Sequence, residues 1–294
     1  MTLRTGLLLS VGLAVVAILF LGTDGEATKG AEEGPRADLI VTTEWLGEHL
    51  DDPNVVVLAT GGQQDFDRGH IPGAGFVPHM ATIGENHGIP GPEVLAERLA
   101  EAGARDDARI VIYGDSAMEL GWFYMAFASI GHGDHVSMLS GNIAAWSSEG
   151  RKVSDAAADL ETGHLTPRPA PDVVVDAAWV KDRLEAPDVH VLDVRTQRER
   201  NGGYVPGSEL VLWQDLFSNV DEMRFKSKDA IHALLVESGL TPGQEVVTYC
   251  AVGMRASLMY FAARYIGASS RVYLGSWNDW SRQEGYPIAG GGRN

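Results

Sequence analysis

Short apolar runs recur along the chain, and polar or glycine-rich segments separate them. Residues 55–59 and 189–194 are dominated by valine and leucine, which is typical of strands buried on both faces of a parallel sheet. A helical pattern precedes each of these runs, at residues 43–50 and 176–184. Further strands are predicted at residues 109–113, 135–139, 245–249 and 271–274. Because strands alternate with helices, we predict the α/β class with parallel sheets.

The pattern occurs twice, at a nearly constant distance. Trp45 and Trp179, Leu58 and Leu192, Gly141 and Gly275, and Trp146 and Trp280 are identical pairs, each 134 positions apart. Tyr113 and Tyr249 are 136 positions apart, which a small change in loop length explains. Because chance identities would not keep one register over this length, we predict two homologous domains, residues 38–150 and 172–290. Residues 151–171 contain three prolines and are predicted to form an extended linker.

The N-terminal residues 1–22 form a separate apolar segment. After Arg4, residues 6–22 carry no charge and are rich in leucine, valine, alanine and isoleucine, which is typical of an export signal. A buried helix of a cytosolic domain is less favoured, because it would show polar positions at helical spacing. We expect residues 1–22 to be a signal peptide or a membrane anchor and residues 23–37 to be a tether. Both domains would then lie in the periplasm or be anchored in the inner membrane facing it.

The composition restricts the possible chemistry. Of 294 residues, 45% are hydrophobic and 21% are charged, which is ordinary for a globular protein. The 40 acidic residues against 23 basic ones give a formal charge of −17, which repels phosphate backbones. We therefore expect no nucleic acid partner. The single cysteine, Cys250, excludes an intramolecular disulfide and any zinc site with two or more cysteine ligands.

Cys250 follows directly after a predicted strand. Residues 250–255 read CAVGMR, and an apolar helical pattern comes next. In open α/β sheets, ligands bind beyond the carboxyl ends of the strands. The amides at the start of a helix favour a thiolate, Gly253 would let the backbone curl around the sulfur, and Arg255 adds positive charge. We interpret Cys250 as a reactive thiol in an anion-stabilising loop rather than as a buried, inert cysteine.

Four segments resemble those of the tandem-domain rhodaneses, a family of sulfurtransferases. They are GHIPGA at residues 69–74, LDVR at residues 192–195, CAVGMR at residues 250–255 and LGSWNDW at residues 274–280. The resemblance extends over residues 38–290 and implies two rhodanese-like domains, each a mainly parallel sheet flanked by helices. It also implies that only the second domain is catalytic. Gly114 and Asp115 agree with this, because they stand where the first repeat would have its cysteine.

The resemblance further implies a double-displacement mechanism. A cysteine thiolate takes a sulfane sulfur from a small anionic donor, becomes a persulfide, and passes the sulfur to a thiophilic acceptor. The site residues implied are Cys250 as nucleophile, Arg195 and Arg255 as donor contacts, and the amides of Ala251, Val252, Gly253 and Met254 as the persulfide loop. Neither a metal nor an organic cofactor is implied.

The sequence leaves the donor open between thiosulfate and 3-mercaptopyruvate. The loop has Ala251 and Val252 where thiosulfate-preferring tandem enzymes have a basic pair and mercaptopyruvate-preferring ones have Gly-Ser. The second domain reads GYVPG at residues 203–207, where the family often has GHIPG. The first domain keeps His70, which we expect to have a structural role in a turn.

Three other classes of protein share parts of this pattern. A non-catalytic persulfide carrier or binding module would keep the same loop without turnover. A phosphatase of the same fold would place five residues between its cysteine and arginine, whereas four separate Cys250 from Arg255. A metal protein is not favoured, because the nine histidines are scattered and His132 and His135 have no nearby ligands in the sequence. We expect the repeated Trp146 and Trp280 to be core residues.

Overall fold

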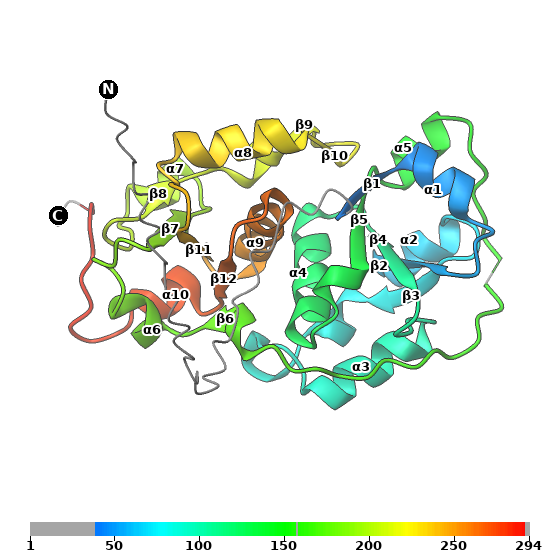
Figure 1. The fold of residues 1–294 in the computed structure, drawn as a ribbon, viewed down its shortest axis with the longest axis horizontal. Helices are drawn as coiled ribbons and strands as arrows, with labels where there is room; N and C mark the ends of the chain where they lie inside the picture. The colour runs from blue at the N-terminus through cyan, green and yellow to red at the C-terminus, as the bar shows by residue number, and fades with distance from the viewer. Residues whose placement is uncertain (1–38, 157, 292–294) are drawn as a thin grey trace, which may run out of the picture. The chain divides into compact units, whose positions relative to one another are not determined.

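Two parallel five-stranded sheets form the framework of the protein (Figure 1). The computed structural model describes residues 39–156 and 158–291. The first sheet contains β1 (Ile40–Thr42), β2 (Val55–Gly61), β3 (Gly75–Pro78), β4 (Arg109–Tyr113) and β5 (Val136–Ser140), in the order β1-β5-β4-β2-β3. The second contains β6 (Val174–Val175), β7 (Val189–Asp193), β8 (Glu209–Leu210), β11 (Glu245–Tyr249) and β12 (Ser270–Tyr273), in the order β6-β12-β11-β7-β8. The equivalent strand orders confirm the α/β class and the internal duplication.

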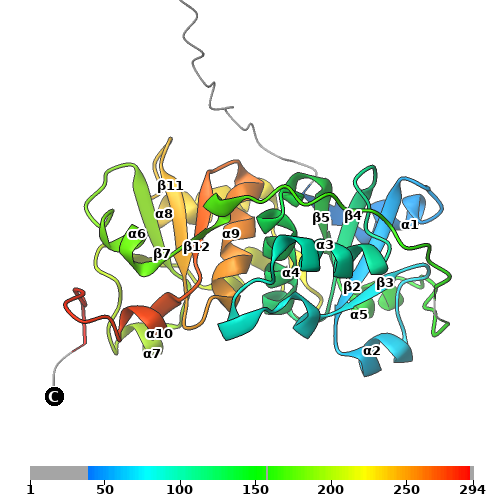
Figure 2. The same ribbon diagram turned by 90° about the horizontal axis from the view of Figure 1, so that it is seen from below.

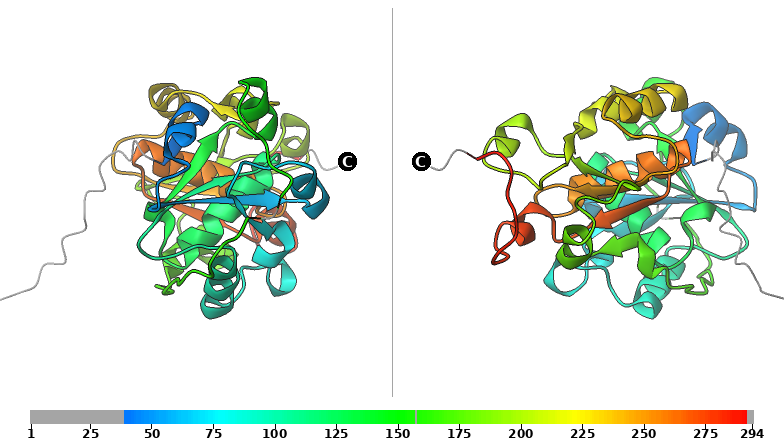
Figure 3. Two further views of the ribbon diagram at one scale, coloured as in Figure 1. Left: turned by 90° about the vertical axis from the view of Figure 1, so that its right-hand side faces the viewer. Right: turned by 60° about the vertical axis from the view of Figure 1, so that its left-hand side comes forward.

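Helices lie on both sides of each sheet (Figure 3). Those of the first domain are α1 (Thr43–His49), α2 (Gln63–Arg68), α3 (Pro92–Glu101), α4 (Ala117–Ser129) and α5 (Ile143–Ser148). Those of the second are α6 (Ala177–Lys181), α7 (Gln197–Arg200), α8 (Lys228–Glu237), α9 (Met254–Ile266) and α10 (Ser276–Trp280). The side chains of Thr42, Ser116 and Asp176 accept backbone N–H bonds at the starts of α1, α4 and α6, which fixes where these helices begin.

The two faces of the first sheet belong to different hydrophobic clusters. On β2, Val56 and Leu58 pack in one cluster, and Val57 and Ala59 pack in the other. Burial on both faces explains why this strand is an uninterrupted apolar run in the sequence. Trp146 and Trp280 are 2% and 0% exposed, so both repeated tryptophans are core residues as predicted.

The two domains meet where α4 packs against α9 (Figure 2). Gly121 of α4 lies so close to α9 that a Cβ atom on it would be 2.6 Å from the Leu258 Cα. Near this contact, the rings of Tyr124 and Phe261 have centroids 4.8 Å apart. Only a residue without a side chain fits such a close approach of two helices.

A small hairpin provides a second contact between the domains. It consists of β9 (Phe217–Asn219) and β10 (Arg224–Phe225), which pair antiparallel. Arg224 forms an ion pair with Glu149 of the first domain, and the Phe225 N–H donates to the Ser140 Oγ at 3.0 Å. The hairpin therefore joins the second domain to the end of β5.

The segment between the domains runs along the first domain. Ser154 and His70 exchange two backbone hydrogen bonds of 2.9 Å each, and the Arg168 N–H donates to the Ile130 carbonyl at 2.9 Å. His70 itself is 1% exposed, and its ring nitrogens lie 2.9 and 3.2 Å from the carbonyl oxygens of Phe66 and Ala156. These contacts agree with the structural role expected for His70.

Among the described residues, no helix is both long and apolar enough to span a membrane. The expected signal peptide or anchor at residues 1–22 and the tether at residues 23–37 lie outside the described residues. Their assignment, and the exact domain limits derived from the repeat, stay predictions.

Candidate active site

Cys250 lies immediately after β11, the central strand of the second sheet. The residue is fully buried. Its N–H donates to the Ser276 Oγ at 3.1 Å, and its carbonyl oxygen accepts from the Trp277 N–H at 2.9 Å. The start of α10 thus holds the cysteine backbone in place.

The turn from Cys250 into α9 depends on one glycine. Gly253 has φ +88° and ψ −25°, in the left-handed region that favours glycine. A Cβ atom there would lie 2.6 Å from the Leu274 Cδ1. The Ala251 carbonyl accepts from the Asn278 N–H at 3.1 Å, whereas the Val252 side chain is half-exposed. The loop therefore has a fixed backbone and an apolar outer surface.

Arg255, in the first turn of α9, forms a two-pronged ion pair with Glu199. The Nη1–Oε2 and Nη2–Oε1 distances are 2.8 and 2.7 Å. The hydrogen bond from Arg255 lowers the pKa of Glu199 to about 2. In turn, the hydrogen bond to Glu199 raises the pKa of Arg255, and the nearby Cys250 contributes in the same direction. A fixed positive charge thus lies beside the cysteine.

Arg195 is buried, with a side chain 1% exposed. Its Nε and Nη2 donate to the two carboxylate oxygens of Asp193 at 2.9 and 2.8 Å, and its Nη2 also donates to the Gly203 carbonyl at 2.8 Å. The guanidinium carbon lies 4.6 Å from the ring centroid of Trp277 on α10. In this arrangement Arg195 braces the end of β7 and does not reach solvent. A direct contact with the donor, which the resemblance implied, would require Asp193 to release it.

The other arginines after β7 differ in their surroundings. Arg200 contacts Asp193 and Ser208, and its guanidinium carbon lies 3.7 Å from the ring centroid of Tyr204. Arg198 is exposed on the surface of α7. Neither adds an unpaired buried cation to the surroundings of Cys250.

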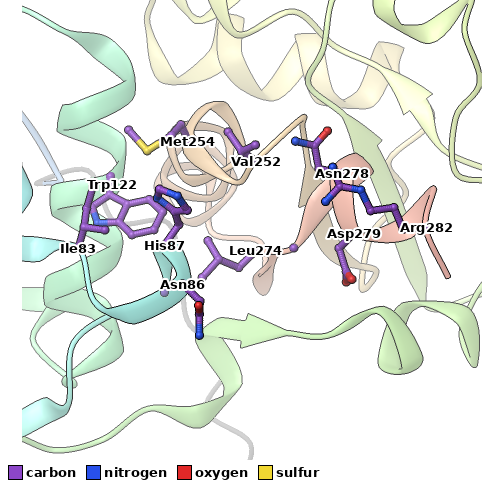
Figure 4. A pocket seen from close by; sticks show the side chains of 12 residues that line it. Ile83, Asn86, His87, Trp122, Val252, Met254, Leu274, Asn278, Asp279 and Arg282 are labelled. Carbon is purple, nitrogen blue, oxygen red and sulfur yellow. The ribbon is translucent and has the colours of Figure 1, made fainter.

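A cavity of about 560 Å³ opens beside the loop (Figure 4). The first domain contributes Ile83, Asn86, His87 and Trp122 to its lining. The second contributes Val252, Met254, Leu274, Asn278, Asp279 and Arg282. Asn86 and His87 have φ values of +52° and +59°, in a turn that the Gly84 N–H closes by donating to the Gly88 carbonyl at 2.8 Å. The cavity is therefore completed by a strained turn from the other domain.

The first domain has a smaller cavity of about 280 Å³ at the equivalent place. Gly114 and Asp115 lie there at the positions of Cys250 and Ala251 in the repeat, and both line it together with Asp65 and Glu119. Burial raises the pKa of Asp115, and the negative charge of Asp65 adds to this effect. Carboxylates thus occur where the second domain has a thiol and an arginine.

Sequence reasoning did not find Glu199, Ser276 or Asn278 as parts of the site. The Thr196 side chain and Glu199 form a capping box at the start of α7, and the pattern T-x-x-E at residues 196–199 could have revealed it. The ion pair with Arg255, by contrast, joins residues that are 56 positions apart and depends on the fold.

The described parts of the chain contain no group of three or more His, Cys, Asp or Glu side chains that could hold a metal ion. The Nε2 of His132 lies 2.9 Å from the Thr166 carbonyl oxygen.

Comparisons with known proteins agree with this geometry. The family model described as "Rhodanese-like domain" matches residues 42–149 and 176–283. A probable 3-mercaptopyruvate sulfurtransferase of Pseudomonas aeruginosa is 27% identical over 284 residues, covering 86% of this chain and 98% of its own. A thiosulfate sulfurtransferase of Azotobacter vinelandii is 27% identical over 266 residues, covering 85% and 96%.

The fold is similar to that of a solved structure as well. The crystal structure of SseA from Escherichia coli, described as a 3-mercaptopyruvate sulfotransferase, superposes with a TM-score of 0.71 at 24% identity. The superposition covers 81% of this chain and 98% of the other. The two family matches include most of the chain, and each contains one of the two sheets in large part. The protein therefore belongs to the rhodanese family, with two rhodanese-like domains in tandem.

Proposed function

We propose that the protein is a sulfurtransferase in which Cys250 carries the transferred sulfur as a persulfide. The observation that carries this proposal is the position of the single cysteine, which lies between the central strand and the first turn of α9, beside Arg255. The names of the relatives from P. aeruginosa and A. vinelandii, both sulfurtransferases, support the same class of reaction.

The reaction consists of two displacements at sulfur. In the first, the electron pair of the Cys250 thiolate forms a bond to the outer sulfur of the donor. The bond between that sulfur and the rest of the donor breaks, and its electron pair leaves with the donor remainder. In the second, an acceptor attacks the outer sulfur of the persulfide, and the pair of the broken S–S bond returns to Cys250. Each cycle ends with the thiolate restored.

The charges of the loop favour both anionic forms of Cys250. The amides at the start of α9, from Ala251 to Met254, and the guanidinium of Arg255 stabilise a thiolate or persulfide. Glu199 acts as a positioning residue, because its two oxygens hold both terminal nitrogens of Arg255. We assign Arg255 to the donor site and give Arg195 a bracing role through Asp193.

Thiocyanate production tests this function. The purified protein should convert cyanide to thiocyanate with thiosulfate or 3-mercaptopyruvate as donor. Cys250→Ser should lose this activity with unchanged thermal unfolding, because a hydroxyl without an adjacent base is a poor nucleophile. Undiminished activity in Cys250→Ser would overturn the proposal. A persulfide that forms on the wild type but resists every acceptor tested would instead favour a carrier without turnover.

We also propose that the domains are exported across the inner membrane. The uncharged run at residues 6–22, preceded by Arg4, supports this location. The test is cell fractionation with a reporter fused after Asn294. Recovery of the full-length fusion only in the cytosol would contradict export.

A further inference from the structure

We propose that Ser276 is a positioning residue for sulfur transfer, because it sets the orientation of the peptide groups that follow Cys250. The proposal rests on the persulfide chemistry proposed above and adds a residue from the start of α10 to it. Three features carry it: the backbone conformation of Ser276, the hydrogen bonds between α10 and the loop, and the difference from the equivalent turn of the first domain.

Ser276 has a backbone conformation that serine rarely adopts. Its φ is +55°, in the left-handed region that favours glycine, and the residue is fully buried. Among the described residues other than glycine, only Asn86, His87 and Met223 also have a positive φ. A residue in such a conformation persists only where the surrounding contacts fix it, and residues of this kind cluster at functional sites.

The Ser276 hydroxyl joins Cys250 to the neighbouring strand. Its Oγ accepts from the Cys250 N–H at 3.1 Å and donates to the Tyr273 carbonyl, at the end of β12, at 2.9 Å. Because the direction of a side chain follows the backbone dihedrals, an ordinary negative φ would move the hydroxyl away from these two partners. The left-handed conformation therefore places the hydroxyl where it holds the Cys250 amide.

The same turn brings the first N–H groups of α10 onto the loop. Among the described residues, no side chain caps the start of this helix. Instead, the Trp277 N–H donates to the Cys250 carbonyl at 2.9 Å, and the Asn278 N–H donates to the Ala251 carbonyl at 3.1 Å. The loop thus satisfies donors that the start of a helix leaves without a partner, and α10 in turn fixes two carbonyls of the loop.

These bonds determine where the next two N–H groups point. A trans peptide group is planar, so its N–H is directed opposite to its C=O, and the described chain has no cis peptide bond. Because α10 holds the carbonyls of Cys250 and Ala251, the N–H groups of Ala251 and Val252 are directed away from α10. Within the described residues, neither of them donates to a protein acceptor. Both are therefore available to a thiolate or persulfide on Cys250.

The first domain has the same turn without this arrangement. Asn142 stands 134 positions before Ser276, at its place in the repeat. Its φ is −124°, and its side chain accepts from the Ala145 N–H at 3.0 Å, so it caps α5 instead. Within residues 39–156 and 158–291, no hydrogen bond joins Asn142 to Gly114, which stands at the position of Cys250. The left-handed residue and its contact with the loop accordingly belong to the repeat that has the cysteine.

Two substitutions test the role of the hydroxyl. Ser276→Ala removes it and keeps the strained backbone, whereas Ser276→Gly removes it and relieves the strain. Both should slow persulfide formation with thiosulfate or 3-mercaptopyruvate by about 10-fold, because misaligned amides stabilise the sulfur anion less. The rate is followed by intact-protein mass at successive times after mixing. Urea denaturation should show Ser276→Gly to be the more stable variant, so similar losses of rate in both cannot come from stability.

The ultraviolet absorbance of the thiolate gives a second readout, which does not depend on sulfur transfer. It is measured against pH, and the spectrum of the same protein carrying Cys250→Ser is subtracted to remove the tyrosine signal. In both Ser276 variants the profile should move to higher pH by about half a unit to one unit, because the loop stabilises the thiolate less.

Ser270→Ala is the matched control for both measurements. Ser270 lies on β12 and is also buried, at 7% exposed, and its hydroxyl also donates to a backbone carbonyl, that of Tyr260, at 3.2 Å. Within the described residues it has no hydrogen bond to the loop after Cys250. The rate of persulfide formation and the pH profile should both stay at their wild-type values.

Wild-type rates and pH profiles in both Ser276 variants would overturn the inference. Wild-type behaviour of Ser276→Gly alone would overturn it as well, since the strain and not the missing hydroxyl would then cause the loss in Ser276→Ala. If the wild type forms no persulfide with either donor, the proposed function fails instead, and the pH profiles still test the role of Ser276.

Discussion

Around Cys250, the charged side chains occur as matched pairs. Arg255 is bound by Glu199 at two points, and Arg195 is bound by Asp193 in the same way. Pairing fixes the orientation of each arginine, because a two-pronged contact restrains a guanidinium more than a single bond does. The sequence motifs LDVR and CAVGMR identified both arginines, but they did not show which carboxylates pair with them. The burial of Arg195 depends on how Trp277 and Gly203 pack around it, which no spacing in the sequence reveals.

At this scale we predict that Arg195→Ala destabilises the fold more than it weakens donor use. It would leave the buried Asp193 carboxylate without its strongest partner, at a cost of about 3–5 kcal/mol in the free energy of unfolding. Urea denaturation checks this value. The exposed Arg198→Ala is the control and should change the free energy of unfolding by less than about 0.5 kcal/mol. An Arg195→Ala protein of normal stability but with a raised KM for the donor would show instead that Arg195 contacts the donor.

Among the secondary-structure elements, the connection from β11 to α9 determines where the chemistry takes place. The sequence predicted β4 and β11 to the residue, because both are apolar runs with clear polar boundaries. It did not predict β1, β6, β8 or the hairpin of β9 and β10, since two or three residues show no periodicity. The glycine in the loop was recognised, but its contact with Leu274 comes from a segment 21 positions further along.

We predict that Gly253→Ala greatly reduces sulfur transfer. Its Cβ would lie 2.6 Å from the Leu274 Cδ1, so the loop after Cys250 would have to move. Gly243→Ala is the matched control, because Gly243 has a similar φ of +85° but no atom within 4 Å of the added Cβ. Both substitutions place an alanine at a positive φ, which costs about 1 kcal/mol in the free energy of unfolding. Only Gly253→Ala adds a steric clash. Equal kcat values for the two variants would show that the loop tolerates displacement.

For the molecule as a whole, the decisive features lie between the two domains. The cavity that Val252 and Met254 line also includes residues 86–88 of the first domain, and α4 meets α9 at Gly121. The sequence predicted two similar domains but could not predict how they pack against each other. The repeat shows which positions of the two domains are equivalent, and it carries no information about which side chains touch across the interface. The hairpin that carries Arg224 has no counterpart in the first sheet, so the repeat gave no sign of its role.

The ion pair between Glu149 and Arg224 predicts a pH dependence of stability. Burial by itself would raise the pKa of Glu149. Hydrogen bonds from Arg151 and Arg224 outweigh this effect and lower the pKa to about 2. A carboxylate with a depressed pKa stabilises the fold fully above its unfolded pKa, near 4.5, and this contribution is lost as the pH falls toward 2. We expect Glu149→Gln to lose about 1–2 kcal/mol at pH 7 and to differ little from the wild type near pH 2.

Chemical denaturation at several pH values measures this difference. Glu222→Gln is the control, since Glu222 contacts the same arginine at 3.3 Å but is more exposed. Because Glu199 is present in all three proteins, its own titration cancels in the comparison. A constant difference between Glu149→Gln and the wild type from pH 7 to pH 2 would contradict the assignment.

Intact-protein mass spectrometry tests the central claim most directly. The chain has one cysteine, so a gain of one sulfur atom by the protein can be compared between the wild type and Cys250→Ser without a disulfide or second thiol to confuse it. After incubation with thiosulfate or 3-mercaptopyruvate and removal of the excess donor, the wild type should gain one sulfur atom with at least one donor. Cyanide should then remove that sulfur, and Cys250→Ser should gain none. No gain with any donor, or an equal gain in Cys250→Ser, would contradict a persulfide on Cys250.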